Sequence, residues 1–157
     1  MEPLEVVGVR VEMPSNQPLV LLREVGGERY LPIWIGAVEA TAIAFAQEGV
    51  EPPRPLTHDL LKDLLDALGR TVRQVRITDL LDGVFYAVID LGDGVEVSAR
   101  PSDAIALALR CDAPILGADE VLEAAGVPVA DDEEDEVKAF REFIENVSPE
   151  DFERGDG

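Results

Sequence analysis

The only histidine of the chain, His58, lies in its densest polar segment, Arg54-Pro55-Leu56-Thr57-His58-Asp59. Any acid–base chemistry by an imidazole must therefore use this residue. Thr57 is a suitable N-cap, which places His58 and Asp59 in the first turn of a helix. An acid there is ordinary because it complements the helix dipole, and the His-Asp dipeptide lacks the spacing of a zinc or nucleophile motif. His58 and Asp59 are candidates for catalysis, with a plain helix start as the alternative.

Two further acids, Glu39 and Asp103, occupy equivalent places in two similar runs, LPIWIGAVEATAIAFA (31–46) and VEVSARPSDAIALAL (95–109). Each run predicts a strand followed by a short helix, with the acid at the helix start. Both helices are apolar on every face, and such a helix must be covered by protein on all sides. We therefore expect two buried Ala-rich helices, each carrying a carboxylate in its first turn. The alternative is that both acids only complement helix dipoles, for about 0.3–1 kcal/mol each.

The acids Glu39, Asp59 and Asp103 could together hold Mg²⁺ or Mn²⁺, because these hard cations take oxygen ligands and often only one or two carboxylates. Arg54 or Arg100 could then bind a phosphate group. The sequence contains no Gly-rich phosphate loop, no serine or cysteine nucleophile arrangement and no closed set of zinc ligands. A hard-metal site is the metal chemistry that remains open.

The net charge of −20 limits how the chain could bind nucleic acid, since binding by counterion release normally needs a basic patch. Any such site must rest on a local cluster of arginines. Tyr30 and Trp34 lie two pleats apart on one face of an expected strand and could stack on bases. Such a pair more often belongs to a core or a subunit interface, which is the interpretation we favour.

The composition indicates one folded domain in a reducing compartment. The 157 residues are 46% hydrophobic, enough for one core. Cys111 is the only cysteine, which excludes an intramolecular disulfide and fits the cytosol. The first five residues lack the features of a signal peptide, and no apolar run reaches membrane length. We expect a cytoplasmic protein without a membrane segment.

Turn signals and periodicity divide residues 1–126 into two similar series of elements. Strands are expected near residues 4–13, 18–25, 28–35, 71–80, 84–91 and 94–100, and helices ending near Glu48, spanning 57–69 and starting at Pro101. The order is βββα, a linking helix, then βββα. It predicts an α+β domain of internally duplicated βββα halves, with mostly antiparallel strands around the two buried Ala-rich helices.

Residues 127–157 are expected to form an acidic linker and a C-terminal amphipathic helix. Of the 33 acids in the chain, 15 lie from residue 119 onward, and Asp131 to Glu136 form a continuous acidic run. Val137, Phe140, Ile144 and Val147 then repeat at helical spacing. This stripe needs a docking surface on the chain's own core, on a neighbouring subunit or on another partner.

Four segments together resemble the bifunctional nuclease domain family: LPIWIGAVEATAIA, EPPRPLTHDLL (51–61), FYAVIDL (85–91) and SARPSDAIALALR (98–110). The resemblance spans roughly residues 4–125, and four motifs in the same order are specific where any one would be weak. It implies an oligomeric α+β domain that acts on DNA and RNA. The acidic linker and the SPEDF ending are similar to the actinobacterial branch. All six candidate site residues lie inside the matching motifs.

The function that these observations favour is a metal-assisted phosphodiesterase acting on DNA and RNA. In this interpretation Glu39, Asp59 and Asp103 hold the ion, His58 serves as general base or orients water, and an arginine binds the scissile phosphate. An acidic surface with few aromatic residues favours a non-catalytic oligomeric binding or regulatory module instead. A hydrolase of small phosphate esters is the third possibility, because a small substrate would tolerate the acidity better than a polymer would.

Overall fold

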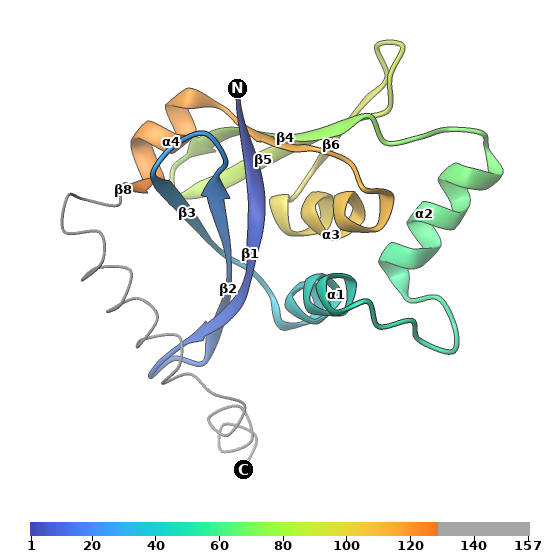
Figure 1. Ribbon diagram of the computed structural model, residues 1–157, viewed down its shortest axis with the longest axis horizontal. Coiled ribbons are helices and arrows are strands. Elements are labelled where there is room, and N and C mark those ends of the chain that lie inside the picture. Colours follow the sequence, from blue (N-terminus) through green and yellow to red (C-terminus); the bar gives the residue numbers. More distant parts are fainter. Residues whose placement is uncertain (129–157) are drawn as a thin grey trace.

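The computed structural model describes residues 1–128, which form a sheet of eight strands and four helices (Figure 1). The acidic run and the apolar stripe expected after residue 128 lie outside the described residues, and the division into residues 1–126 and 127–157 stays a prediction. Within residues 1–128, no helix has the length and apolar content needed to cross a membrane.

The first half of the domain contains β1 (Glu2–Glu12), β2 (Gln17–Glu24), β3 (Arg29–Trp34) and α1 (Ala37–Glu48). The helix ends at Gly49, whose φ of 67° lies in the left-handed region that glycine adopts without a steric cost. The predicted end of the first helix is confirmed.

The second half follows a linking helix. Its elements are α2 (Thr57–Ala67), β4 (Gln74–Leu81), β5 (Val84–Asp90), β6 (Glu96–Ala99) and α3 (Pro101–Cys111), followed by β7 (Ile115–Gly117), α4 (Asp119–Ala125) and β8 (Val127–Pro128). Asp82 and Gly83, between β4 and β5, have φ values of 52° and 78°. Two successive positive φ angles are what a tight two-residue hairpin requires, so this predicted turn is confirmed.

The strands form one sheet in the order β6-β5-β4-β7-β1-β2-β3-β8. Each half is an antiparallel meander, and β7 joins them by pairing parallel with β4 and antiparallel with β1. The predicted α+β class with a mostly antiparallel sheet is confirmed. Both halves share one strand order, as internal duplication requires, but the duplication itself stays a prediction.

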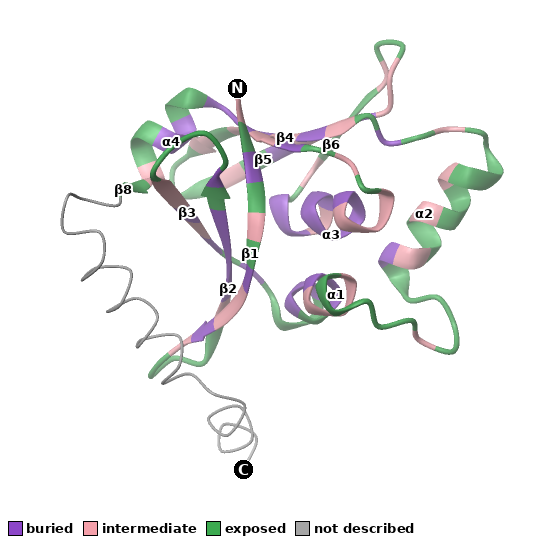
Figure 2. Cartoon of the chain, viewed as in Figure 1, coloured by how far each residue is buried: buried purple, intermediate pink, exposed green. Residues whose placement is uncertain are grey.

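The hydrophobic core lies between one face of the sheet and the helices (Figure 2). In this layer α1 packs against β1 and β2, α3 packs against β4 and β5, and the two helices contact each other. Fully buried side chains from both halves meet there, among them Leu22, Leu31, Ile43, Ile77 and Ile105. One continuous core therefore holds both strand-to-helix junctions in fixed positions.

The two Ala-rich helices differ in burial, contrary to the expectation that both are covered on all sides. In α3 the five consecutive residues 104–108 are all buried. In α1, Val38 and Thr41 are exposed, so described residues cover only one side of this helix. The prediction was wrong for α1 because single apolar side chains such as Val38 are common on protein surfaces, and an apolar composition does not force every face inward.

Candidate functional site

The starts of α1 and α3 converge on Arg100. Glu39 is the third residue of α1 and Asp103 is the third residue of α3, a position where free backbone amides favour a carboxylate. Nη1 of Arg100 lies 3.1 Å from Oε1 of Glu39, while Nε and Nη2 each lie 2.9 Å from Oδ2 of Asp103. One guanidinium group thus bridges two acids from the two halves of the fold.

The imidazole of His58 contacts the same cluster from the start of α2. Its Nε2 lies 2.9 Å from Oδ1 of Asp103, so this carboxylate binds His58 through one oxygen and Arg100 through the other. An ionised carboxylate only accepts hydrogen bonds, and Nε2 must therefore carry the proton in this pair. That tautomer leaves Nδ1 of His58 as the ring position that can take up a proton.

The exposure of these groups differs sharply. The side chain of His58 is 7% exposed and that of Arg100 is 67% exposed. The hydrogen bond to Asp103, followed by the charges of Asp103 and Glu39, raises the pKa of Arg100 above its ordinary value. The cluster therefore presents a permanently charged guanidinium to solvent and keeps the imidazole behind it.

Asp59 belongs to a different contact, made with Arg110 at the end of α3. Nε of Arg110 donates to Oδ1 of Asp59 at 2.7 Å, Nη1 donates to the carbonyl of Ala106 at 2.8 Å, and Nη2 donates to the carbonyl of Ala42 at 3.1 Å. Arg110 therefore connects α1, α2 and α3 in the region where they pack (Figure 1). Since α2 has His58 as its only buried residue, this tie helps to fix where the imidazole lies.

The environment of Asp59 keeps it ionised. Burial by itself would raise its pKa, but the hydrogen bonds from Arg110 and from the backbone amide of Leu56 outweigh burial and lower the pKa below its ordinary value. The Leu56 amide donates to Oδ2 of Asp59 at 3.0 Å, which satisfies one of the free donors at the start of α2. Leu56 is the N-cap and Thr57 is the first helical residue, so the predicted cap was wrong by one position.

The structure brings together four of the six predicted site residues, namely Glu39, His58, Arg100 and Asp103. Asp59 is the chain neighbour of His58 but faces Arg110, and Arg54 is exposed in the loop before α2. The sequence analysis missed Arg110 as a site residue. Its signal was a single basic residue directly after the apolar run 104–109 of α3, since a buried cation needs specific acceptors.

The arrangement does not resemble a preformed site for a divalent cation. Within residues 1–128 no cluster of three or more acid, histidine or cysteine side chains has the geometry to hold a metal ion. Glu39 and Asp103 both bind Arg100, and Asp59 binds Arg110, so each proposed ligand already has a guanidinium partner. A cation would have to compete with these groups, and the assignment of the three acids as metal ligands stays a prediction.

Comparisons with known proteins point to one family. The family model described as bifunctional nuclease domain matches residues 20–130. A protein of Mycobacterium tuberculosis named as uncharacterized is 53% identical, with 97% of this chain and 98% of the relative covered. Bifunctional nuclease 2 of Arabidopsis thaliana is 33% identical over 66% of this chain and 34% of its own length. Bifunctional nuclease 1 of Oryza sativa subsp. indica is 30% identical over 70% of this chain and 35% of its own length.

The matched region holds all the residues of the Arg100 cluster together with Asp59 and Arg110. It extends over most of the chain and contains both strand-to-helix junctions. The resemblance seen in the sequence is confirmed, and the chain belongs to the bifunctional nuclease domain family.

Proposed function

We propose that the protein is a nuclease that hydrolyses phosphodiester bonds in DNA and RNA, with His58 as general base. The observation that carries the proposal is the 2.9 Å contact between Nε2 of His58 and Oδ1 of Asp103, which orients the ring and leaves Nδ1 free to accept a proton. The printed names of the plant relatives, bifunctional nucleases, support the same class of reaction.

In the proposed reaction a water oxygen attacks the phosphorus atom while Nδ1 of His58 takes the proton of that water. The bond from phosphorus to the leaving oxygen breaks, and the leaving oxygen takes a proton from solvent. Asp103 stabilises the imidazolium that forms, in the way that a carboxylate supports a catalytic histidine elsewhere. Arg100, whose guanidinium is largely exposed, would bind the phosphate oxygens as their negative charge increases.

The metal requirement is a separate part of the proposal. As the sequence predicts, Mg²⁺ or Mn²⁺ would be held by Glu39, Asp59 and Asp103 and would supply Lewis-acid stabilisation of the phosphate. Asp59 would first have to leave Arg110, because the three acids form no common cluster within residues 1–128. Because all three acids are paired with arginines, the steps assigned to His58, Asp103 and Arg100 do not depend on the ion. Activity that disappears in EDTA and returns with Mg²⁺ or Mn²⁺ would support the metal requirement. Full activity in EDTA would rule out the metal requirement and would leave the role of His58 unaffected.

The decisive experiment compares His58→Gln with Asp63→Asn, both purified exactly as the wild type is. Glutamine can still donate to Asp103 but has no nitrogen that takes up a proton. We expect DNase and RNase activity to fall by about 10²–10⁴-fold, the usual contribution of general-base catalysis. Asp63 is an exposed acid on the same helix and should retain full activity. Equal activity in all three proteins would show either that His58 is not the base or that the activity is a contaminant.

A non-catalytic oligomeric module is the second candidate, favoured by a specific feature of α2. Leu56, Leu60, Leu64 and Leu68 recur at intervals of four residues and are all exposed. A continuous apolar stripe on a helix indicates a contact surface. Under this proposal Leu60→Glu with Leu64→Glu lowers the molecular mass measured by light scattering, and no phosphodiester, including bis(p-nitrophenyl) phosphate, is hydrolysed by the wild type.

We also propose that the protein is a cytoplasmic homo-oligomer. A single, partly buried cysteine fits a reducing compartment. Burial raises the pKa of the Cys111 thiol, which keeps it in the less reactive protonated form. The exposed leucines of α2 support self-association, and the mass measurement above tests it.

A further inference from the structure

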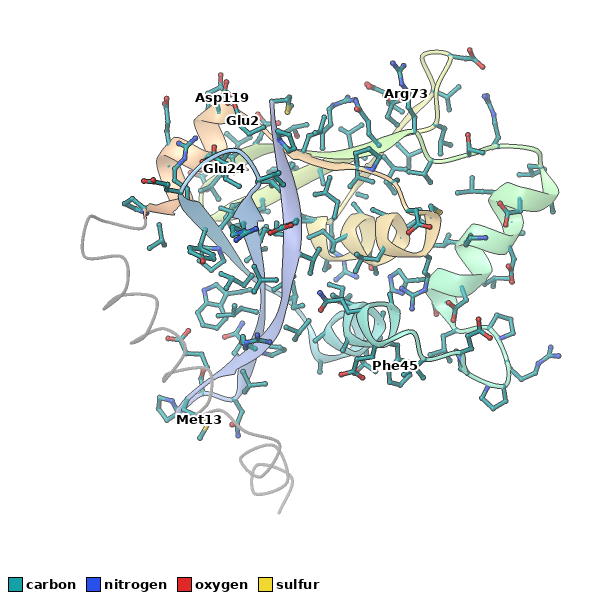
Figure 3. All side chains as sticks on the ribbon, in the orientation of Figure 1. Glu2, Met13, Glu24, Phe45, Arg73 and Asp119 are labelled. Atoms are coloured by element: carbon teal, nitrogen blue, oxygen red, sulfur yellow. The ribbon has the colours of Figure 1, made fainter. Side chains whose placement is uncertain are left out.

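The sheet of the first half has a second apolar face, opposite the core. Leu19 and Leu21 of β2 alternate with Val20 and Leu22, and only the latter two belong to the core cluster. Cross-strand pairs place Trp34 beside Leu19 and Pro32 beside Leu21. We call this surface, formed by β1, β2 and β3 on the side away from α1, the outer face. Side chains project from both faces of these strands in Figure 3.

Two leucines of the outer face are buried although they lie outside the core. Leu21 is 1% exposed and Leu19 is 8% exposed, and neither is part of the cluster between the sheet and the helices. A strand that is apolar on both faces is typical of a sheet covered on both sides. Within residues 1–128, the buried hydrophobic residues of α1, α3 and α4 belong to the core cluster, so these three helices do not cover the outer face.

The same face carries the charged side chain of Arg10, whose Nε lacks a hydrogen-bond acceptor within residues 1–128. It pairs across the strands with Leu19, and its Nη1 donates to the carbonyl of Val9 at 2.8 Å. Nε of Arg10 is buried and has no hydrogen-bond partner among the described residues. Burial lowers the pKa of Arg10, because desolvation disfavours the charged form. A partly buried guanidinium with an unpaired Nε is stabilised by a carboxylate from the group that covers the face.

The chain leaves the described region beside this face. Strand β8 pairs with β3 through Val127 and Pro128, opposite Tyr30 and Arg29. Residue 137, where the apolar stripe begins, lies nine positions further along, and an extended chain of that length reaches about 30 Å. A helix of 11 residues would be about 16 Å long, comparable to the width of three strands, about 15 Å.

We propose that residues 137–147 of the same molecule cover the outer face, with Val137, Phe140, Ile144 and Val147 on Leu19, Leu21 and Trp34. Of the acids in the segment, Glu142 projects opposite the apolar stripe on a helix, whereas Glu145 lies closer to the stripe and is the carboxylate that we assign to Arg10. Apolar surface on both partners and the exit point of the chain favour this occupant over an unrelated protein. The inference does not depend on the nuclease proposal.

Trp34 makes the proposal testable, because it is the only tryptophan in the chain and lies on the outer face. The experiment measures acrylamide quenching of Trp34 fluorescence in the full chain carrying Phe140→Asp and Ile144→Asp. The matched control is Asn146→Asp, which places the same side chain off the stripe. We expect the quenching constant to rise in the double variant, by at most about two-fold since Trp34 is already 49% exposed, and to stay unchanged in the control.

Three results would overturn the proposal. Equal quenching in the double variant and the wild type would show that the segment does not cover Trp34. Wild-type quenching that rises on dilution, together with a falling molecular mass, would assign the cover to a second copy. An equal rise of the quenching constant in the Asn146→Asp control would show that the apolar stripe is not what covers Trp34. If the double variant melts below the assay temperature, the quenching constants of the single variants Phe140→Ala and Ile144→Ala, measured at low temperature, give the same comparison.

Discussion

The two strand-to-helix junctions of this fold are alike in chain geometry and differ in chemistry. Each places a carboxylate at the third residue of its helix, and both carboxylates bind the same guanidinium, Arg100. Of these two acids, only Asp103, in the second half, also binds an imidazole, because α2 occurs once among the described residues and packs against α3. A repeated scaffold therefore produces an asymmetric site, with Asp103 as the acid that orients His58 and Glu39 as the acid that holds Arg100.

The largest expected effect is a loss of activity that differs between variants of these two acids. Asp103→Asn should lower kcat/KM for DNA and RNA by about 10²-fold or more, since an amide in place of the carboxylate neither selects the tautomer of His58 nor stabilises its charged form. Glu39→Gln should cost less than about 10-fold, because Arg100 keeps its contacts to Asp103. Steady-state kinetics on both variants measures the ratio. Equal losses would mean that the two junctions contribute symmetrically and that the imidazole contact is incidental.

A smaller effect is expected when the group shared by both junctions is changed. Arg100→Lys retains the positive charge but loses the planar fork that contacts Glu39 and Asp103 together. We expect kcat/KM to fall by about 10-fold, with KM rising if Arg100 also binds phosphate. Arg100→Gln should lose more, because it removes the charge as well. A lysine variant with wild-type kinetics would show that only the charge at this position matters.

Sequence patterns predicted the local structure of both junctions because that structure is set by near neighbours. The hairpin at Asp82-Gly83, the end of α1 at Gly49 and the acids at the helix starts all follow from backbone preferences over a few residues. The predicted cap at Thr57 was wrong by one residue because the carboxylate of Asp59 caps the amide of Leu56, which allows an apolar residue to occupy the N-cap.

The contacts that create the asymmetry could not be derived in this way. His58 and Asp103 are 45 residues apart, and Asp59 and Arg110 are 51 residues apart. Periodicity shows which face of a helix is apolar but not which helices become neighbours or how an arginine distributes its donors. Asp59 could be taken as a metal ligand only while its partner was unknown. In the structure the carboxylate of Asp59 binds Arg110 and thereby holds α2 against α3.

The smallest expected effect on activity tests that holding contact, through stability and its dependence on pH. Asp59→Asn should lower the free energy of unfolding by about 1–3 kcal/mol at pH 7, because it weakens a charge-assisted hydrogen bond to the buried Arg110. Activity should fall less than in either Arg100 variant if the reaction needs no metal ion, since neither Asp59 nor Arg110 touches the reacting groups in the steps assigned to His58, Asp103 and Arg100. Chemical denaturation followed by circular dichroism measures the difference.

The pKa of Asp59 fixes how this difference varies with pH. Folding lowers the pKa below the ordinary value of 3.8, so the unfolded chain binds the proton more readily than the folded protein does. The contribution of Asp59 is then fully present well above pH 3.8 and is lost as the pH falls through the lower pKa of the folded state. The wild type should lose its advantage over Asp59→Asn across that acidic window, whereas Asp63→Asn, an exposed acid on the same helix, should differ from the wild type by less than about 0.5 kcal/mol. A stability difference that stays constant through the acidic window would mean that the charge of Asp59 does not hold α2 against α3. The asymmetry of the two junctions would then have another cause than the contact between Asp59 and Arg110.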